Sequence, residues 1–196
     1  GNHDSVATLN ESRALFARLG ATVVAGLAPD PAAQVLMLPR RDGQPGCLVG
    51  ALPFIRPRDV LTSQAGASGA DKQRDLQQAI EAYYAAVHAA LLQRQQALAA
   101  RLGRRLPLVL TGHLASLGAS ASESVREIYV GALAAFPARA FPPADYIALG
   151  HIHRPQSVGG LEHIRYSGAP LPLSFDEAEQ QKEVLLVDLD ATGLAA

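Results

Sequence analysis

Three short glycine-containing segments hold four of the six histidines and the side chains best suited to chemistry. They read GNHD (Gly1 to Asp4), GH (Gly112 and His113) and GHIH (Gly150 to His153). Imidazole nitrogens and the neutral oxygen of an asparagine are ligands that suit Mn²⁺, Fe²⁺ or Zn²⁺ better than a thiolate-loving ion. Two histidines at positions i and i+2 of a turn can serve one metal or two adjacent ones.

Each segment alone has a plainer explanation, because a single Gly-His after a strand is more often a turn with a hydrogen-bonded histidine. The conjunction of the three segments favours a metal site. No Ser/His/Asp or Cys/His arrangement and no phosphate-binding P-loop competes with this interpretation.

The segments that precede the later histidines predict buried strands. Leu106 to His113 and Ala144 to His153 are apolar runs of the kind found in a sheet covered on both faces. Loops at the carboxyl ends of such strands are where α/β proteins place their sites. Glycine lets the backbone turn tightly and approach a ligand there.

The rest of the chain predicts a mixed α/β domain. We expect a long helix over 71–102, with apolar positions at helical spacing, Tyr83 among them, and Gln95 as the one interruption. We also expect a short helix over 10–19. Five further strands are expected over 21–26, 34–39, 47–54, 162–168 and 183–190. The strands 34–39 and 47–54 should form a hairpin.

Composition bounds the function. The chain has 196 residues, is 48% apolar and carries a net charge of −1, so any phosphate binding must be local. No apolar run approaches the roughly 18 residues of a membrane span. The single Cys47 excludes an internal disulfide and suggests a reducing cytosol. We interpret Cys47 as core, His88 as a helix-flank residue and His163 as structural.

The three motifs, in this order, resemble the last three motifs of the calcineurin-like metallophosphoesterase superfamily. Longer stretches such as PFIRPRDVLTSQAG, FPPADYIALGHIHRPQ and EHIRYSGAPLPLSFDE resemble the SbcD family, the nuclease subunits of bacterial SbcCD complexes. The resemblance covers nearly the whole chain. It implies a four-layer α/β/β/α sandwich for the fold.

The resemblance also implies roles for individual residues. Asn2, His113 and His151 would bind one divalent metal, Mn²⁺ being the expected ion, and His153 would bind a second. His3 would act as general acid near the scissile phosphate, and Asp4 would orient the His3 imidazole.

The family begins with two further motifs, D-x-H and G-D, and neither occurs in this sequence. We therefore expect residues 1–196 to be a nuclease-domain fragment, incomplete at its N-terminal side and without the family's C-terminal capping domain. The implied function is DNA exonuclease and endonuclease activity in double-strand-break and hairpin processing, with this fragment impaired. The alternatives to a DNA nuclease are a generic phosphatase or phosphodiesterase and a non-catalytic scaffold.

Partners follow from the same resemblance. They would be DNA, an SbcC-like ATPase and a second copy of the chain, in the bacterial cytoplasm at the nucleoid, with no membrane involved. Arginines that could contact DNA phosphates are Arg154, Arg56 and Arg58, with Arg126 and Arg165 as weaker candidates. For each of them a surface salt bridge is the more common role.

Overall fold

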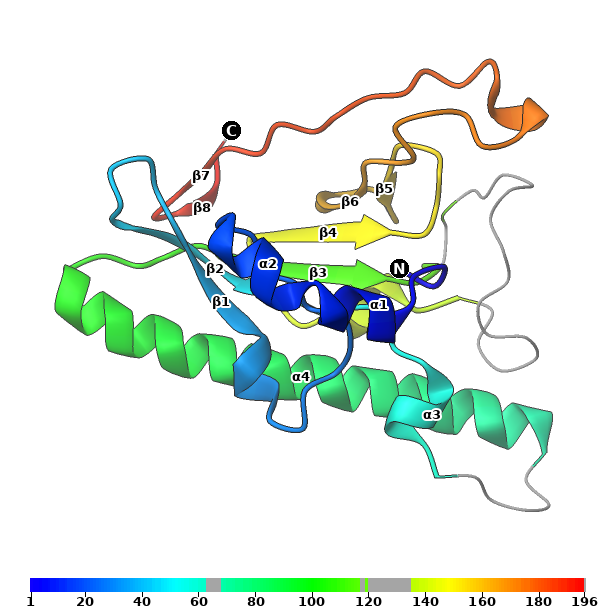
Figure 1. Cartoon of the computed structure of the whole chain (residues 1–196), viewed down its shortest axis with the longest axis horizontal. Helices are drawn as coiled ribbons and strands as arrows, with labels where there is room; N and C mark the ends of the chain where they lie inside the picture. Colours follow the sequence, from blue (N-terminus) through cyan, green and yellow to red (C-terminus); the bar gives the residue numbers. More distant parts are fainter. Residues whose placement is uncertain (63–67, 117–118, 120–134, 196) are drawn as a thin grey trace.

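A six-stranded sheet forms the centre of the computed structural model, which describes residues 1–62, 68–116, 119 and 135–195 (Figure 1). The strand order is β1-β2-β3-β4-β6-β5. Neighbours among β2, β3, β4 and β6 are parallel, while β1 and β5 pair antiparallel at the two edges. The strands are β1 (Val35–Pro39), β2 (Pro45–Gly50), β3 (Leu108–His113), β4 (Tyr146–Gly150), β5 (Gln156–Val158) and β6 (Leu161–Tyr166). The prediction of a mixed α/β domain is confirmed.

Both edges of the sheet are hairpins. The predicted hairpin of β1 and β2 is confirmed, with Val35 opposite Gly50 and Leu38 opposite Cys47. The second hairpin joins β5 to β6 through two glycines in the left-handed region, Gly159 and Gly160. Only its β6 strand was expected, since three residues carry too short a pattern to predict β5.

The long helix α4 (Gly69–Leu102) covers one face of the sheet (Figure 1). The Ser68 hydroxyl caps its start by accepting from the Asp71 amide, and Gly103 ends it in a left-handed conformation. Gly50 lets the helix approach β2, because a Cβ there would lie about 3.0 Å from Val87 and Leu91 side-chain atoms.

Two details of the predicted helix were wrong. Tyr84, not Tyr83, is the fully buried tyrosine of this helix, whereas Tyr83 is half-buried and its hydroxyl donates to the Ala28 carbonyl and the Gln34 side chain. Gln95 is no interruption: it is buried, and its amide donates to the Leu106 carbonyl at 2.5 Å. That hydrogen bond satisfies the polar group inside the core.

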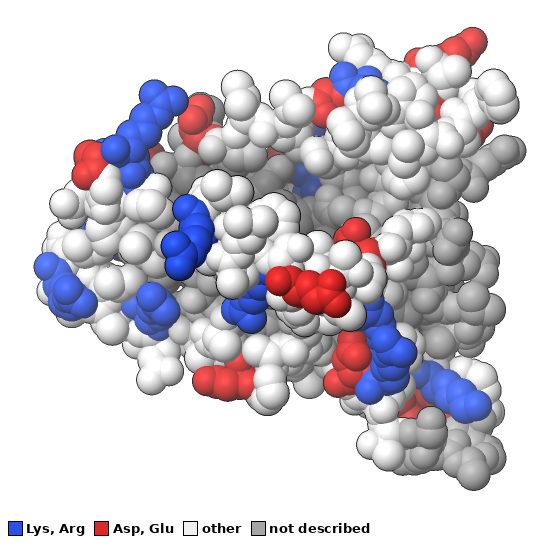
Figure 2. Space-filling model, viewed as in Figure 1, with Lys and Arg blue, Asp and Glu red and all other residues white. Residues whose placement is uncertain are grey.

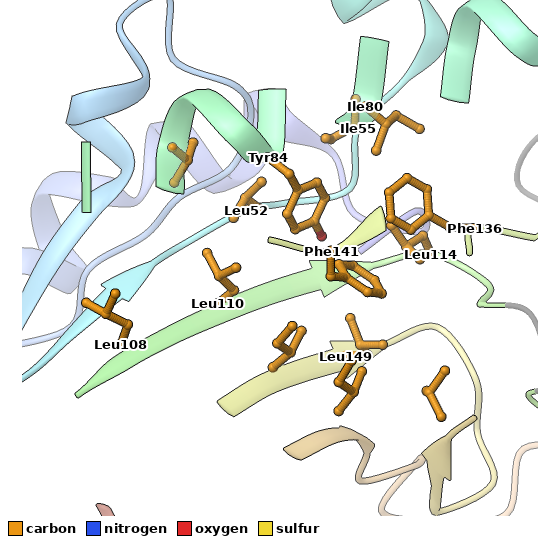
Figure 3. Close-up of a cluster of buried hydrophobic side chains, with 14 of the residues drawn as sticks. Leu52, Ile55, Ile80, Tyr84, Leu108, Leu110, Leu114, Phe136, Phe141 and Leu149 are labelled. Carbon is orange, nitrogen blue, oxygen red and sulfur yellow. The ribbon is translucent and has the colours of Figure 1, made fainter. Parts of the chain in front are cut away.

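The core lies between α4 and the sheet. The Tyr84 ring reaches down from α4 toward Phe141 and Phe136, which lie over the ends of the strands near Leu114 (Figure 3). The ring centroids of Tyr84 and Phe141 are 5.4 Å apart. The Tyr84 hydroxyl donates to the Thr111 carbonyl at 3.1 Å, so this aromatic group fixes the end of β3 that carries His113.

The opposite face of the sheet is less covered than predicted. In β3, buried residues alternate with half-buried ones, where burial on both faces was expected. The predicted strand 183–190 is also wrong, since only Leu189–Asp190 (β7) forms a ladder, with Gly193–Leu194 (β8). Residues 183–187 lie over this face but leave a cavity of about 460 Å³ beside Tyr146 and Arg165. Without a paired neighbour in the described part of the chain, this segment forms no sheet hydrogen bonds.

The N-terminal region differs from prediction as well. The expected helix is two short ones, α1 (Val6–Glu11) and α2 (Arg13–Arg18), separated at Ser12. The expected strand 21–26 does not form, since these residues belong to no ladder among the described residues. Short helices α3 (Pro57–Val60), η1 (Pro31–Gln34), η2 (Ala138–Ala140) and η3 (Phe175–Glu177) complete the described elements. No helix in these ranges is long and apolar enough to cross a bilayer.

Candidate metal centre

Parallel pairing of β3 and β4 brings two of the histidine segments together. The register places His113 opposite Gly150, the residue before His151. The N-terminus lies beside the same carboxyl ends of the strands (Figure 1). Segments far apart in the sequence therefore meet at one edge of the sheet, where α/β proteins commonly place their sites.

A close polar contact at this edge joins the first segment to the second. Nε2 of His113 lies 2.6 Å from Oδ1 of Asn2. The His113 ring rests against the backbone of the third segment, because a Cβ on Gly150 would lie 2.9 Å from Nδ1 of His113. Phe54 supports the ring edge-on at a centroid distance of 6.0 Å. A side chain at position 150 would therefore push the His113 ring out of its present place.

His151 is the third member of the cluster. Its ring centroid lies 5.4 Å from that of His113, and the residue is buried. Its φ of 99° makes it the one non-glycine residue in the described part of the chain with a positive φ. Such a conformation costs on the order of 1–3 kcal/mol and is concentrated at functional sites.

Burial keeps both central imidazoles neutral. It lowers the pKa of His113 to about 4, helped by the neighbouring His151. Burial also lowers the pKa of His151 to about 4, with His153 and His3 contributing. Neutral imidazoles offer the lone pairs that a metal ion needs. One amide oxygen and two neutral imidazoles fit a borderline divalent ion in donor type.

His3 and Asp4 lie on the exposed side of this cluster. The charge of His3 acts on the pKa of His113, His151 and Asp4, so it stands near all three. The Asp4 carboxylate accepts from the Gly1 nitrogen. The orienting role of Asp4 toward His3 stays a prediction.

His153 makes a different set of contacts. Its Nδ1 lies 2.9 Å from Oε1 of Glu177, a carboxylate buried completely. Within the described ranges, no group of three or more His, Cys, Asp or Glu side chains is arranged to hold a metal ion. The structure thus brings Asn2, His113 and His151 together, while His153 as a ligand of a second ion stays a prediction.

The candidate DNA-binding arginines differ in position. Arg56 is part of the site's border, because it donates to the Asp4 carbonyl at 3.3 Å and lies 5.8 Å from the Phe54 ring centroid. Arg58 and Arg154 are more exposed. Arg165 pairs with Glu162 and Glu183.

Arg126 lies outside the described residues. On the face shown in Figure 2, Lys and Arg side chains are interspersed with acidic and uncharged residues. That face shows no broad basic surface. The candidates for DNA contact are therefore individual arginines.

Sequence reasoning missed Glu177 and Lys182. An acid in a polar, proline-rich segment looks solvent-exposed, and the only hint was that LPLSFDE belongs to a stretch that resembles the SbcD family.

The predictions for the two other histidines and for the cysteine have different outcomes. His88 and His163 are half-buried, as flank and strand residues are. Cys47 is half-buried rather than core, and burial raises its pKa.

Comparisons with known proteins agree with the motifs. The chain is 55% identical over 187 residues to the SbcD subunit of the nuclease SbcCD from Escherichia coli K12, covering 95% of this chain and 44% of that protein. It is 38% identical over 196 residues to the SbcD subunit from Rhodobacter capsulatus, covering 96% and 46%. A match to the Bacillus subtilis SbcD subunit is 40% identical over 82 residues, 41% of this chain and 21% of that protein.

No protein-family model matches the chain. The chain spans less than half the length of the Escherichia coli and Rhodobacter capsulatus relatives. The similarity extends over 95% and 96% of this chain in these two relatives. The resemblance drawn from the motifs is confirmed: this chain belongs to the SbcD family of SbcCD nuclease subunits.

Proposed function

We propose that the protein acts as the nuclease component of an SbcCD-type enzyme and hydrolyses DNA phosphodiester bonds. An SbcC-type ATPase is its partner, in the processing of double-strand breaks and hairpins in the bacterial cytoplasm at the nucleoid. The observation that carries the proposal is the convergence of Asn2, His113 and His151 at one sheet edge. The names of the relatives support the activity and the partner.

Asn2, His113 and His151 would hold one divalent ion, with Mn²⁺ the expected metal, and His153 would contribute to a second. Two such ions, when bound, supply an activated water and neutralise the phosphate charge. The remaining ligands would come from D-x-H and G-D motifs, which this sequence lacks.

The chain's own acid-base contribution comes from His3. It stands on the exposed side of the cluster, where it can meet a phosphate and donate a proton to the departing oxygen. General acid catalysis of this kind contributes about 10²–10⁴-fold. Asp4, the next residue, would orient the His3 imidazole.

A panel of substrates separates this proposal from a generic phosphatase or phosphodiesterase. DNA ends, DNA hairpins and small phosphoesters are incubated with Mn²⁺ and the full-length protein that contains this chain. Cleavage of DNA, lost in His3→Ala, supports the nuclease. Hydrolysis of the small esters alone would reject it.

The isolated chain should have little activity, and this keeps the scaffold alternative open. The expectation rests on the D-x-H and G-D motifs, which would supply the remaining ligands and do not occur in this sequence. The same Mn²⁺-dependent assay on the purified chain decides the matter. Robust cleavage that depends on His3 would contradict the expected impairment.

We further propose that the fold is the α/β half of a four-layer sandwich and that the protein forms homodimers. The half-buried second face of the sheet supports the first point. For the second, the support is an apolar strip on and beside α2, where Leu15, Phe16 and Leu19 are 63%, 38% and 74% exposed.

A further inference from the structure

Glu177 lies at the centre of a buried hydrogen-bond network around His153. Its Oε1 lies 2.9 Å from Nδ1 of His153, and its Oε2 accepts from Nζ of Lys182 at 2.8 Å and from the Leu173 amide at 3.1 Å. The carboxylate has no exposed surface, and the Lys182 side chain is only 12% exposed.

Burying a carboxylate is costly unless several donors compensate it. Here Lys182, the Leu173 amide and the imidazole N–H supply those donors. A buried ion pair is weak evidence for stability, because apolar residues of similar volume often stabilise a fold as well or better. The placement of Glu177 therefore calls for a role beyond holding its own segment.

The same segment also fixes the backbone of His153. The carbonyl of His153 accepts from the Ala169 amide at 2.9 Å and from Nζ of Lys182 at 3.3 Å. Gly168, with φ of 80°, allows this approach, since a Cβ there would lie 2.6 Å from that carbonyl oxygen. Both the ring and the main chain of His153 are thus held by residues 168–182.

We propose that Glu177 is a positioning residue for the candidate metal centre. Its carboxylate keeps the neutral His153 imidazole protonated at Nδ1, which leaves the lone pair on Nε2 for a metal ion. Histidine ligands of metals commonly donate their second ring N–H to a carboxylate in this way. The inference deepens the proposed function and rests on it for the role of the metal.

The tautomer of His153 is measurable without any metal. Long-range ¹H–¹⁵N correlation spectra of the metal-free chain, at about pH 8 and above the ordinary histidine pKa of about 6.5, report which ring nitrogen carries the proton. We expect the proton on Nδ1 and none on Nε2. An unprotonated Nδ1 in the unsubstituted chain overturns the proposal, whether or not the substituted proteins described below fold.

Glu177→Gln should reverse the tautomer. Lys182 and the Leu173 amide both require an acceptor, so the single oxygen of the glutamine turns to them. The glutamine NH₂ then faces Nδ1, which must accept, and the proton moves to Nε2. The matched control is Glu179→Gln, an exposed position two residues along, which should leave the spectrum of His153 unchanged.

A second variant separates positioning from general support of the fold. Lys182→Gln weakens the same network but leaves the Glu177 carboxylate opposite Nδ1, so the tautomer should persist. If both variants shifted His153 alike, or if neither did, Glu177 would not be selecting the tautomer. Should one of the two variants fail to fold, the spectrum of the unsubstituted chain still decides the proposal.

The last measurement is the affinity for Mn²⁺. Mn²⁺ affinity of the full-length protein should fall about 10–100-fold in Glu177→Gln, as for other outer-shell partners, and stay within twofold in Glu179→Gln. A reversed tautomer with unchanged Mn²⁺ affinity would refute the link to the metal. If the substrate panel instead showed no nuclease activity, the tautomer result would still stand, so the two failures are distinguishable.

Discussion

Oδ1 of Asn2 and Nε2 of His113 lie 2.6 Å apart although 111 positions separate the two residues in the sequence. Two potential ligand atoms face one another at the carboxyl edge of the sheet, with His151 beside them. Nothing in either residue alone distinguishes this pair from an ordinary side-chain hydrogen bond. The neighbouring buried, neutral imidazole favours the metal interpretation, and substitution can decide it.

Asn2→Ala should weaken Mn²⁺ binding, because it removes the one amide oxygen of the cluster. Loss of an outer-shell partner typically costs about 10–100-fold in affinity, so loss of a direct ligand should cost at least about tenfold. Titration of the chain with Mn²⁺, following free Mn²⁺ by EPR, measures the change. The control Asn10→Ala alters an exposed asparagine of α1. Equal affinities for Asn2→Ala and the unsubstituted chain would argue against this ligand.

Gly150→Ala should displace the His113 ring while sparing the fold. The new Cβ would lie 2.9 Å from Nδ1 of His113, and a side-chain ring can move by the few tenths of an ångström required. The expected result is a shifted His113 imidazole signal in NMR spectra and weaker Mn²⁺ binding, with the melting temperature little changed. Gly69→Ala is the control, since nothing lies within 4 Å of a Cβ there. An unmoved His113 signal would show that the site has more room than the structure indicates.

Arg154→Ala should reduce DNA affinity through the loss of one phosphate contact. Arg154 is exposed and directly follows His153, so its side chain can reach the phosphate backbone of DNA bound at the site. Each phosphate contact contributes about 0.9 to the slope of log K against log salt concentration on duplex DNA. Fluorescence anisotropy of the full-length protein over a range of salt should show a slope smaller by about one. Arg139→Ala, an exposed arginine in η2, should leave the slope unchanged, and equal effects of both would rule out a specific contact.

Gln95→Leu should destabilise the chain, because it leaves the buried Leu106 carbonyl without the amide that reaches it at 2.5 Å. An unsatisfied buried polar group costs about 1–3 kcal/mol. Urea denaturation followed by circular dichroism measures the free energy of unfolding. Gln96→Leu, on the exposed side of α4, is the control and should change it by less than about 0.5 kcal/mol.

Gln95 also illustrates what the sequence could and could not predict. Hydrophobic periodicity identified α4 and the strands β1, β2, β3, β4 and β6, because their patterns report burial directly. It treated Gln95 as a gap, since no pattern states that a polar side chain has a partner inside the core. The strands predicted over 21–26 and 183–190 failed for another reason. A strand exists only when a neighbour pairs with it, and local sequence does not specify that neighbour.

The candidate site likewise has a part that the sequence predicts and a part that it does not. Glycine followed by histidine after an apolar run predicted which residues meet, because parallel strands end at a common edge. Glu177 was invisible, since its burial depends on Lys182 and on a segment that folds back over the His153 loop. Contacts made through tertiary folding of an irregular segment leave no periodic signal.

The apolar strip of Leu15, Phe16 and Leu19 leads to the last prediction. Leu19→Glu should abolish self-association, because a charge placed in the centre of an apolar interface is desolvated without a partner. Sedimentation of the full-length protein should show a dimer that becomes a monomer in the variant. Since Leu19 is 74% exposed, the melting temperature of a dilute sample should not fall. Leu171→Glu, at a residue 68% exposed elsewhere on the surface, is the matched control and should remain dimeric. A monomer in the unsubstituted protein, or dimers that persist in Leu19→Glu, would exclude this strip as the dimer contact.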